Sequence, residues 1–300
     1  METVLKTYGI SKSYKNKAVL SDVNISIQRG DIYGFVGKNG AGKTTLIRIL
    51  SGLSLPTSGK FELFGISSDS KDIVKARKRI CSMVESPAIY PELTAVDNMK
   101  AQCLILKKPF SVIAENLNFV GLGDVGKKKV KDFSLGMRQR LAIAVALIGE
   151  PELMLLDEPI NGLDPEGIKQ VREMLLKLRN EKGITILISS HILSELSLLA
   201  TRYGFIDNGR ILKEATAEEV IDATSEKCYL DVDDVDKAME CLTALGYKPT
   251  VQDEKIKIPT DVDLMKVCAD FANHGVYLHK HIHASVDLEE YFMRLIGGQQ

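Results

Sequence analysis

A glycine-rich stretch of nine residues constrains this chain more than any other feature of its sequence. Residues 37–45 read GKNGAGKTT, between the apolar runs 32–36 and 46–50. The first run predicts a buried strand and the second predicts a helix. Glycines at 37, 40 and 42 allow tight turns that direct backbone N–H groups inward, and the helix start adds partial positive charge. The stretch therefore predicts a phosphate-binding loop.

Two side chains of this loop extend the prediction to a nucleotide with a metal ion. Lys43 is placed to reach the β- and γ-phosphates, and the hydroxyl of Thr44 is placed to hold Mg²⁺. A tight turn without a ligand rarely needs a lysine and two threonines as well. The loop residues expected to contact the nucleotide are Gly37, Lys38, Asn39, Gly40, Ala41, Gly42, Lys43, Thr44 and Thr45.

Composition narrows the class of protein. The chain has 300 residues, of which 45% are hydrophobic and 26% charged, as in a soluble globular protein with one large α/β domain and a smaller one. A net charge of −1 gives no excess of positive charge that would attract nucleic acid or anionic lipid. Five cysteines without a Cys-x-x-Cys pair indicate reduced thiols. The chain start lacks the pattern of a signal peptide, and the longest apolar run, 141–148, is too short to cross a bilayer.

Two further apolar strands end in polar residues. Residues 153–156 are followed by Asp157 and Glu158, and such a strand should end at the sheet edge where open α/β sheets bind ligands. Asp157 can hold the Mg²⁺ shell, and Glu158 could orient or deprotonate a water molecule. The strand 184–190 ends at His191, which could donate to the γ-phosphate, although a lone histidine is usually structural.

Two other positions, Tyr14 and Ser134, are candidates for nucleotide contacts. Tyr14 is expected on a loop between two short strands in residues 3–29, where its ring could stack on a purine or could simply be a surface tyrosine. Ser134 is a natural cap for the helix that follows it, whose free N–H groups would form a second anion site. Asp164 closes the turn at residues 161–165.

The rest of the chain suggests two additional parts. Residues 65–131 read as an inserted mixture of helix and loop. After about residue 215 the pattern is β-α-β-β-α-β, which predicts a small ferredoxin-like unit. Its strands are expected at 228–232, 247–251, 254–258 and 276–282, its helices at 235–245 and 263–273, and a final helix at 287–296. His279, His281 and His283 would share one face of a strand and could hold a metal, although polar faces without one are commoner.

The motifs occur in one order over residues 1 to about 215, and together they resemble the ATP-binding cassette of ABC transporters. By that resemblance Tyr14 looks like the adenine-stacking aromatic and residues 37–45 like the Walker A loop. Asp157 and Glu158 look like the Walker B aspartate and the catalytic glutamate, and His191 like the switch histidine. Residues 133–137, with Ser134 and Gly136, look like the signature segment, and residues 161–164, with Asp164, like the D-loop.

Three departures from the common cassette pattern stand out. Glu85 occupies the place of the Q-loop glutamine, where the resemblance implies a catalytic role, a place near the Mg²⁺ shell and contact with a membrane partner. Residues 133–137 read FSLGM instead of LSGGQ, and Lys38 replaces the usual proline. The first two departures, and the tail LEEYF at 288–292, are similar to the bacitracin and lantibiotic exporter subfamily.

The resemblance implies an α/β fold of the P-loop NTPase class: a cassette at 1–215, with a mixed-sheet core and a helical subdomain at about 80–150, and an α+β accessory domain at 216–300. It implies a Mg²⁺-dependent ATPase at the inner face of the cell membrane. Such a subunit drives a separate permease that exports an antimicrobial peptide or a similar hydrophobic compound. Two copies would bind ATP head to tail, and no nucleic acid would be bound. The alternatives are a soluble non-transport ABC ATPase and a regulatory module with little turnover.

Overall fold

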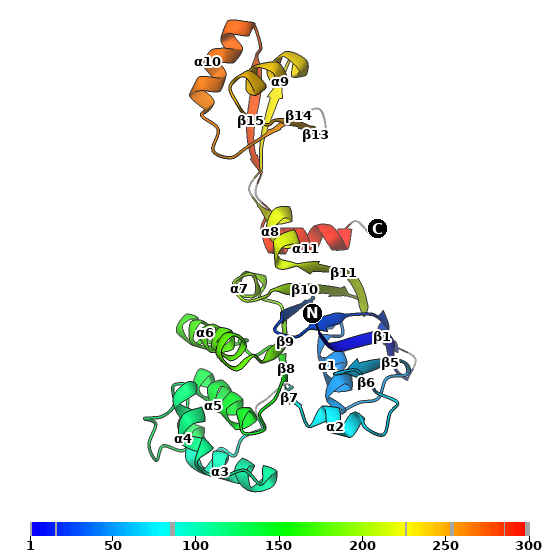
Figure 1. Cartoon of the computed structure of the whole chain (residues 1–300), viewed down its shortest axis with the longest axis vertical. Helices are drawn as coiled ribbons and strands as arrows, with labels where there is room; N and C mark the ends of the chain where they lie inside the picture. Colours follow the sequence, from blue (N-terminus) through cyan, green and yellow to red (C-terminus); the bar gives the residue numbers. More distant parts are fainter. Residues whose placement is uncertain are drawn as a thin grey trace. The chain divides into compact units, whose positions relative to one another are not determined.

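The computed structural model describes residues 2–15, 17–84, 88–225, 227–252, 255–284 and 286–297. The chain forms two compact units (Figure 1), Met1–Ala217 with Leu295–Gln300, and Glu218–Arg294. Among the described residues, every helix is too short or too polar to span a bilayer.

A six-stranded sheet is the centre of the first unit. Its order is β11-β10-β4-β9-β8-β7, and all neighbours are parallel except β10 and β11. The strands are β4 (Ile32–Val36), β7 (Ile80–Met83), β8 (Leu153–Asp157), β9 (Thr185–Ser190), β10 (Arg202–Asp207) and β11 (Arg210–Thr216). Strands β4, β8 and β9 are buried along their whole length, which explains their mainly apolar sequences. Val36 pairs with Ser190, and Asp157 with Ser189, so the carboxyl ends of these strands meet at one edge.

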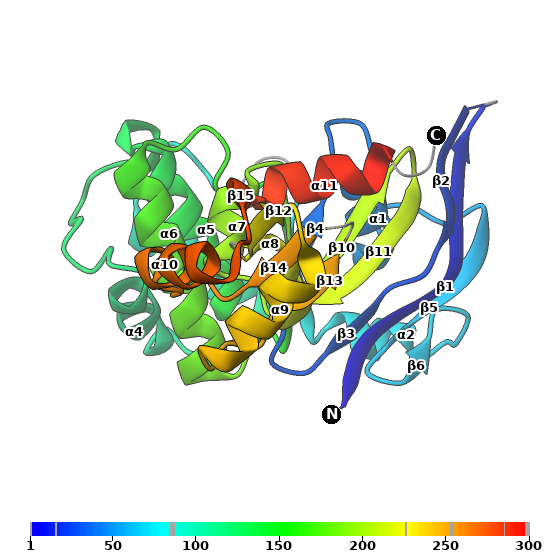
Figure 2. The same ribbon diagram turned by 90° about the horizontal axis from the view of Figure 1, so that it is seen from above.

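An antiparallel sheet covers the other side of helix α1 (Lys43–Ser51). It contains β1 (Thr3–Tyr14), β2 (Lys17–Val23), β3 (Ser26–Gln28), β5 (Ser58–Leu63) and β6 (Ile66–Ser67). Leu46, Ile47, Ile49 and Leu50 of α1 pack in one hydrophobic cluster with residues of both sheets, including Phe61 of β5 and Phe35 of β4. In Figure 2 the long strands β1 and β2 lie at one end of this unit, and α4, α5 and α6 lie at the other.

The prediction for residues 3–29 was wrong in two respects. Tyr14 is the last residue of strand β1 and not part of a loop, because it pairs with Lys17 in the β1–β2 ladder. The alternation V-N-I-S-I at 23–27 favours one half-buried strand, but this stretch is interrupted between β2 and β3. There the hydroxyl of Thr7 donates to Val23 O at 2.9 Å and accepts from Ile25 N at 2.9 Å, so a side chain replaces the backbone partners of a continuous strand.

The helices of the first unit are α2 (Ile73–Arg77), α3 (Ala95–Leu106), α4 (Val112–Phe119), α5 (Leu135–Leu147), α6 (Pro165–Lys182) and α7 (Leu193–Ser197), with a 3₁₀ turn at Val130–Asp132. Helix α3 begins where the hydroxyl of Thr94 accepts a hydrogen bond from Asp97 N at 3.1 Å. The segment predicted as mixed helix and loop from residue 65 also contains strands β6 and β7. Strand β7 belongs to the central sheet because it pairs with β8.

An ionic cluster holds the amino ends of the central strands together. Arg79, just before β7, donates to Glu152 Oε1 at 2.6 Å, and Arg29, before β4, donates to Glu152 Oε2 at 3.0 Å. The hydrogen bond from Arg79 is the largest contribution that lowers the pKa of Glu152 to about 2. This edge of the sheet is opposite the one where Asp157 and Ser189 lie.

The second unit has a four-stranded antiparallel sheet of order β13-β14-β12-β15. Its elements are β12 (Lys227–Val232), α9 (Val235–Ala244), β13 (Thr250–Gln252), β14 (Lys255–Ile258), α10 (Leu264–His274) and β15 (Leu278–Ala284), with α8 (Ala217–Thr224) before them and α11 (Leu288–Gly297) after them. The element order is the one that the sequence predicts. Strand β13 begins three residues later than expected, because Tyr247 N donates to Leu242 O and so closes the turn after α9.

Candidate active site

The loop between β4 and α1 has a backbone that requires glycine. Gly40 and Gly42 have φ angles of 82° and 108°, in the left-handed region. A Cβ atom on Gly42 would lie 2.5 Å from Leu20 Cδ2, and one on Gly37 would lie 2.6 Å from Ile206 O. The loop is therefore packed tightly against β2 and β10, and its residues and the start of α1 line a hollow.

Lys43 lies in this hollow and is 5% exposed. Its Nζ donates to Gly37 O at 2.6 Å and forms an ion pair with Glu158 Oε1 at 3.2 Å. The hollow is lined by Val19, Asn39, Gly40, Gly42, Lys43, Thr44, Thr45 and Glu158. Six of these eight residues belong to the stretch 37–45, so the loop and Glu158 surround one space with a buried cation at its wall.

Asp157, at the end of β8, is held by two hydroxyl groups. Thr44 Oγ1 donates to Asp157 Oδ2 at 2.7 Å, and Ser189 Oγ donates to Asp157 Oδ1 at 2.6 Å. A hydroxyl and a carboxylate in contact beside a phosphate-binding hollow are oxygen ligands of the kind that Mg²⁺ prefers. Asp157 is only 7% exposed, so the residues present fit a small, hard cation next to bound phosphates.

Ser189 is a member of this site that sequence reasoning missed. It is completely buried on β9, directly opposite Asp157 in the sheet. Its hydroxyl also accepts a hydrogen bond from Glu158 N at 3.0 Å. The sequence did contain a signal for Ser189. It is a polar residue near the end of a mainly apolar strand, and that strand ends at the same sheet edge as Asp157 and Glu158.

Glu158 and His191, which lie on different strand ends, are in contact. His191 Nδ1 is 2.8 Å from Glu158 Oε2. Glu158 has a φ of 50°, an uncommon backbone conformation for a residue with a side chain. Its carboxylate therefore lies between Lys43 and His191, next to the hollow, where it could orient or deprotonate a water molecule.

The segment around Ser134 forms a separate cluster. The hydroxyl of Ser134 accepts from Met137 N at 3.2 Å and so caps α5, while Asp164 Oδ1 accepts from Gly167 N at 3.2 Å and caps α6. The starts of the two helices are close to each other. A Cβ atom on Gly136, in α5, would lie 3.7 Å from Gly167 Cα in α6. A Cβ atom on Gly162, just before α6, would lie 3.4 Å from Leu135 Cδ2 in α5. Ser134, Gly136 and Asp164 are not among the residues that line the hollow at Lys43.

The remaining predicted site residues have different surroundings. Tyr14 is 46% exposed, and Lys12 Nζ lies 5.0 Å from the centre of its ring. Ala41 is buried; its N–H donates to Lys38 O, and its carbonyl accepts from Gly209 N, both at 3.1 Å. Glu85 lies outside the described residues.

Comparisons with known proteins agree with this geometry. The family model described as "ABC transporter" matches residues 20–161. The chain is 41% identical to the bacitracin transport ATP-binding protein BcrA of Bacillus licheniformis, over 99% of both chains. It is 46% identical to the lantibiotic transport ATP-binding protein SrtF of Streptococcus pyogenes, over 70% of this chain and 90% of that one.

Two solved structures share the fold over nearly three quarters of the chain. CbiO1 of Clostridium perfringens, part of the ABC transporter complex cbiONQ, has a TM-score of 0.67 and 27% identity, over 74% of this chain and 92% of its own. The dimeric post-hydrolysis cassette MJ0796, bound to ADP and Pi, has a TM-score of 0.63 and 26% identity, over 71% and 98%. Because a full-length relative matches at 41% identity, and because the phosphate loop meets an acidic strand end as nucleotide hydrolysis requires, this chain belongs to the ATP-binding proteins of ABC transporters and is an ATPase.

Proposed function

We propose that this chain is the ATP-hydrolysing subunit that drives a separate membrane permease, in an ABC exporter of an antimicrobial peptide or a similar hydrophobic compound. The observation that carries the proposal is the contact of Lys43, Glu158 and His191 at the phosphate hollow. The bacitracin and lantibiotic transport proteins among the relatives support the choice of cargo. The chain would then work at the inner face of the cell membrane.

Within this proposal each group has a defined task. Residues 37–45 bind the phosphates of ATP, and Tyr14 stacks on its base. Thr44 and Asp157 would hold Mg²⁺, which neutralises charge on the phosphates. Glu158 takes the proton of the attacking water, and His191 orients Glu158 through their 2.8 Å contact. Residues 1–215 form the cassette, and residues 216–300 form an accessory domain.

The cluster at Ser134 supports a head-to-tail dimer. Ser134 and Gly136 lie at a helix start whose N–H groups suit an anion, yet neither lines the hollow of its own chain. A second copy would place them against the nucleotide held by the first, together with Asp164. The dimeric relative with ADP and Pi supports this arrangement. ATP enclosed between two copies would be shielded from water, and hydrolysis would release the copies.

An apolar groove offers a docking place for the permease. It is lined by Leu53, Cys81, Ser82, Met83, Val84, Ala88, Gln102, Ala142, Val145 and Ala146. Leu53 is 69% exposed there. The groove lies between the end of α1, strand β7 and helices α3 and α5, so its occupant would touch both the nucleotide core and the helical subdomain. A short cytoplasmic helix of the permease, apolar on one face, fits such a groove.

Leu53→Asp is expected to separate the chain from its permease without affecting the ATP site. A charge in an apolar contact is costly to desolvate, so copurification of an integral membrane protein from gently solubilised membranes should fall at least about tenfold, a loss of about 1.4 kcal/mol of binding. Cells should lose export at the same time. The matched control is Val74→Asp, on α2 of the same unit and 58% exposed, which should keep both. Equal effects of the two variants would contradict docking in the groove.

Glu85 is proposed to couple hydrolysis to the permease, as the resemblance to the cassette implies. A carboxylate only accepts hydrogen bonds, whereas the glutamine usual in this place also donates. Glu85→Gln should therefore change ATPase activity of the isolated subunit little, while Glu85→Ala should impair export in cells more than ATP binding. Export and turnover measured together on Glu85→Ala provide the test; full export with unchanged turnover would contradict the role.

A further inference from the structure

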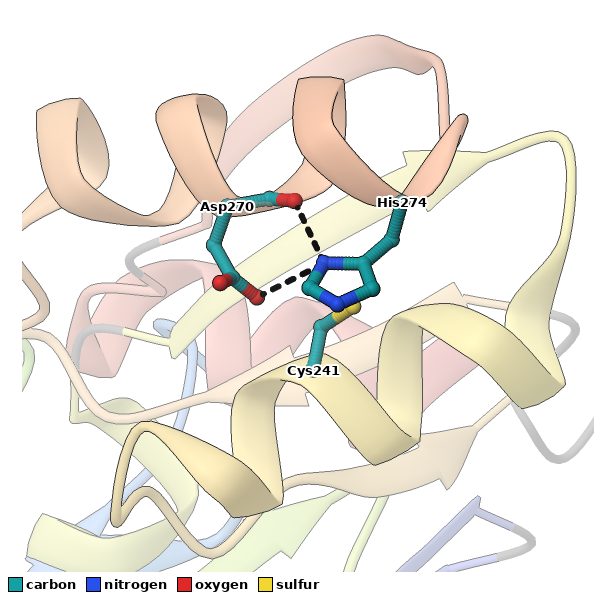
Figure 3. Close-up of side chains that lie close together, drawn as sticks. All are labelled: Cys241, Asp270 and His274. Atoms are coloured by element: carbon teal, nitrogen blue, oxygen red, sulfur yellow. Dashed lines mark hydrogen bonds and ion pairs between the residues drawn. The ribbon is translucent and has the colours of Figure 1, made fainter.

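A cluster of three potential metal ligands lies in the second unit, apart from the ATP site. Cys241 comes from α9, and Asp270 and His274 come from successive turns of α10 (Figure 3). One ligand atom of each residue, a sulfur, a carboxylate oxygen and an imidazole nitrogen, lies within 4.8 Å of the other two. We propose that Cys241, Asp270 and His274 bind a Zn²⁺ ion that joins α9 to α10.

The hydrogen bond of His274 prepares its ring for a metal. His274 Nδ1 is 2.8 Å from the backbone oxygen of Asp270, one helical turn earlier. A carbonyl oxygen only accepts, so Nδ1 carries the proton and Nε2 keeps its lone pair. Figure 3 shows Nε2 on the side of the Cys241 sulfur. A histidine that donates from one nitrogen to a backbone carbonyl and binds metal through the other is a common arrangement in metal sites.

The carboxylate of Asp270 has a buried oxygen that lacks a hydrogen bond and that a cation could bind. Its Oδ2 atom is shielded from solvent and accepts no hydrogen bond. The nearest nitrogen identified, His274 Nδ1, is 3.6 Å away, too far for a hydrogen bond. A carboxylate oxygen without a partner and without water is costly. A metal ion bound by the carboxylate together with Cys241 and His274 would remove that cost.

The set of donor atoms selects the type of metal. Sulfur and imidazole nitrogen disfavour Mg²⁺ and Ca²⁺, which take oxygen ligands, and favour Zn²⁺ and related ions. Three side chains supply three of the four positions of a tetrahedral site. The side chain of His274 is 58% exposed, so a water molecule can reach the fourth position.

Metal binding should depend on pH because the sulfur must lose a proton. Zinc binds the thiolate of a cysteine and the neutral form of a histidine. Each bound Zn²⁺ should therefore displace the protons that these ligands carry. Affinity should accordingly rise with pH.

The expected result is one Zn²⁺ per full-length chain after chelator treatment, measured by titration against a competing indicator. Co²⁺ used as the probe should give the charge-transfer absorption of a thiolate–cobalt bond. Cys241→Ser should abolish that absorption, and both Cys241→Ser and His274→Ala should weaken Zn²⁺ binding at least about tenfold. Zn²⁺ should also raise the melting temperature of the parent chain and not that of either variant.

The matched control is Cys268→Ser, because Cys268 is an exposed thiol on the same helix α10 and outside the cluster. It should bind both metals like the parent. Cys241 is buried, so the exposed His274 provides a variant that leaves the packing of α9 intact. Circular dichroism and the melting temperature without metal, each compared with the parent, would show that either variant folds. The proposal is overturned if no stoichiometric binding occurs, if Cys241→Ser and His274→Ala bind as well as the parent, or if binding is lost in His279→Ala instead.

Discussion

Lys43→Ala is expected to abolish tight ATP binding and to reduce turnover by about 10²–10³-fold, the loss typical when one preorganised electrostatic contact to the reacting group is removed. Lys43 supplies the buried ammonium group at the wall of the hollow, 2.6 Å from Gly37 O. Its charge-assisted hydrogen bonds to the β- and γ-phosphates have no substitute in the loop, because the other lysine, Lys38, is exposed. Equilibrium binding of ATP and the rate of phosphate release measure the two effects.

The matched control for this lysine is Lys75→Ala. Lys75 lies on α2 and has an exposed side chain paired with Asp72, so its loss should leave binding and turnover unchanged. Circular dichroism of both variants would show that the fold is kept. If Lys43→Ala binds and hydrolyses ATP like the parent, the central loop does not bind the nucleotide.

Glu158→Gln is expected to reduce hydrolysis by about 10²-fold or more while ATP still binds. The amide keeps the shape of the side chain but cannot accept the proton of the attacking water. Trapped ATP should then hold two chains together, because the nucleotide is not consumed. Phosphate release gives the first effect, and size-exclusion chromatography with and without Mg-ATP gives the second.

Glu181→Gln is the corresponding control, an exposed glutamate near the end of α6. It should hydrolyse ATP normally and stay monomeric under the same conditions. A Glu158→Gln chain that elutes only as a monomer with ATP would contradict the head-to-tail dimer. Unchanged turnover would contradict the role of Glu158 as the base.

The strands that position the site could be predicted because their sequences are unambiguous. Residues 32–36, 153–156 and 186–188 are apolar and lie in neighbouring strands of the sheet. Parallel pairing alone places their ends at one edge, so Asp157, Glu158 and His191 could be assigned to one site. Ser189 was missed because its importance depends on register: only pairing with Asp157 brings its hydroxyl within 2.6 Å of the carboxylate.

Other features depend on contacts that local sequence does not encode. The gap between β2 and β3 arises from the hydroxyl of Thr7, which is 16 residues from Val23. The same limit applies to the metal prediction. Alternation suggested His279, His281 and His283, and that interpretation stays untested because the side chain of His283 is not among those described. The Cys241 cluster needs the packing of α9 on α10, which no periodic pattern reveals.

The ammonium group of Lys43 pairs with Glu158 in this structure, and the phosphates of ATP would need the same ammonium group. At 3.2 Å the lysine is already neutralised by the carboxylate, so arriving phosphates must compete with Glu158. The affinity for ATP therefore reports the difference between two ion pairs, and not the lysine–phosphate attraction alone. Once the phosphates take the lysine, Glu158 keeps its contact with His191 through Oε2, and its Oε1 atom is free to receive the attacking water. The substrate itself thus frees the oxygen that faces the water, whereas in the empty site that oxygen stays paired with the lysine.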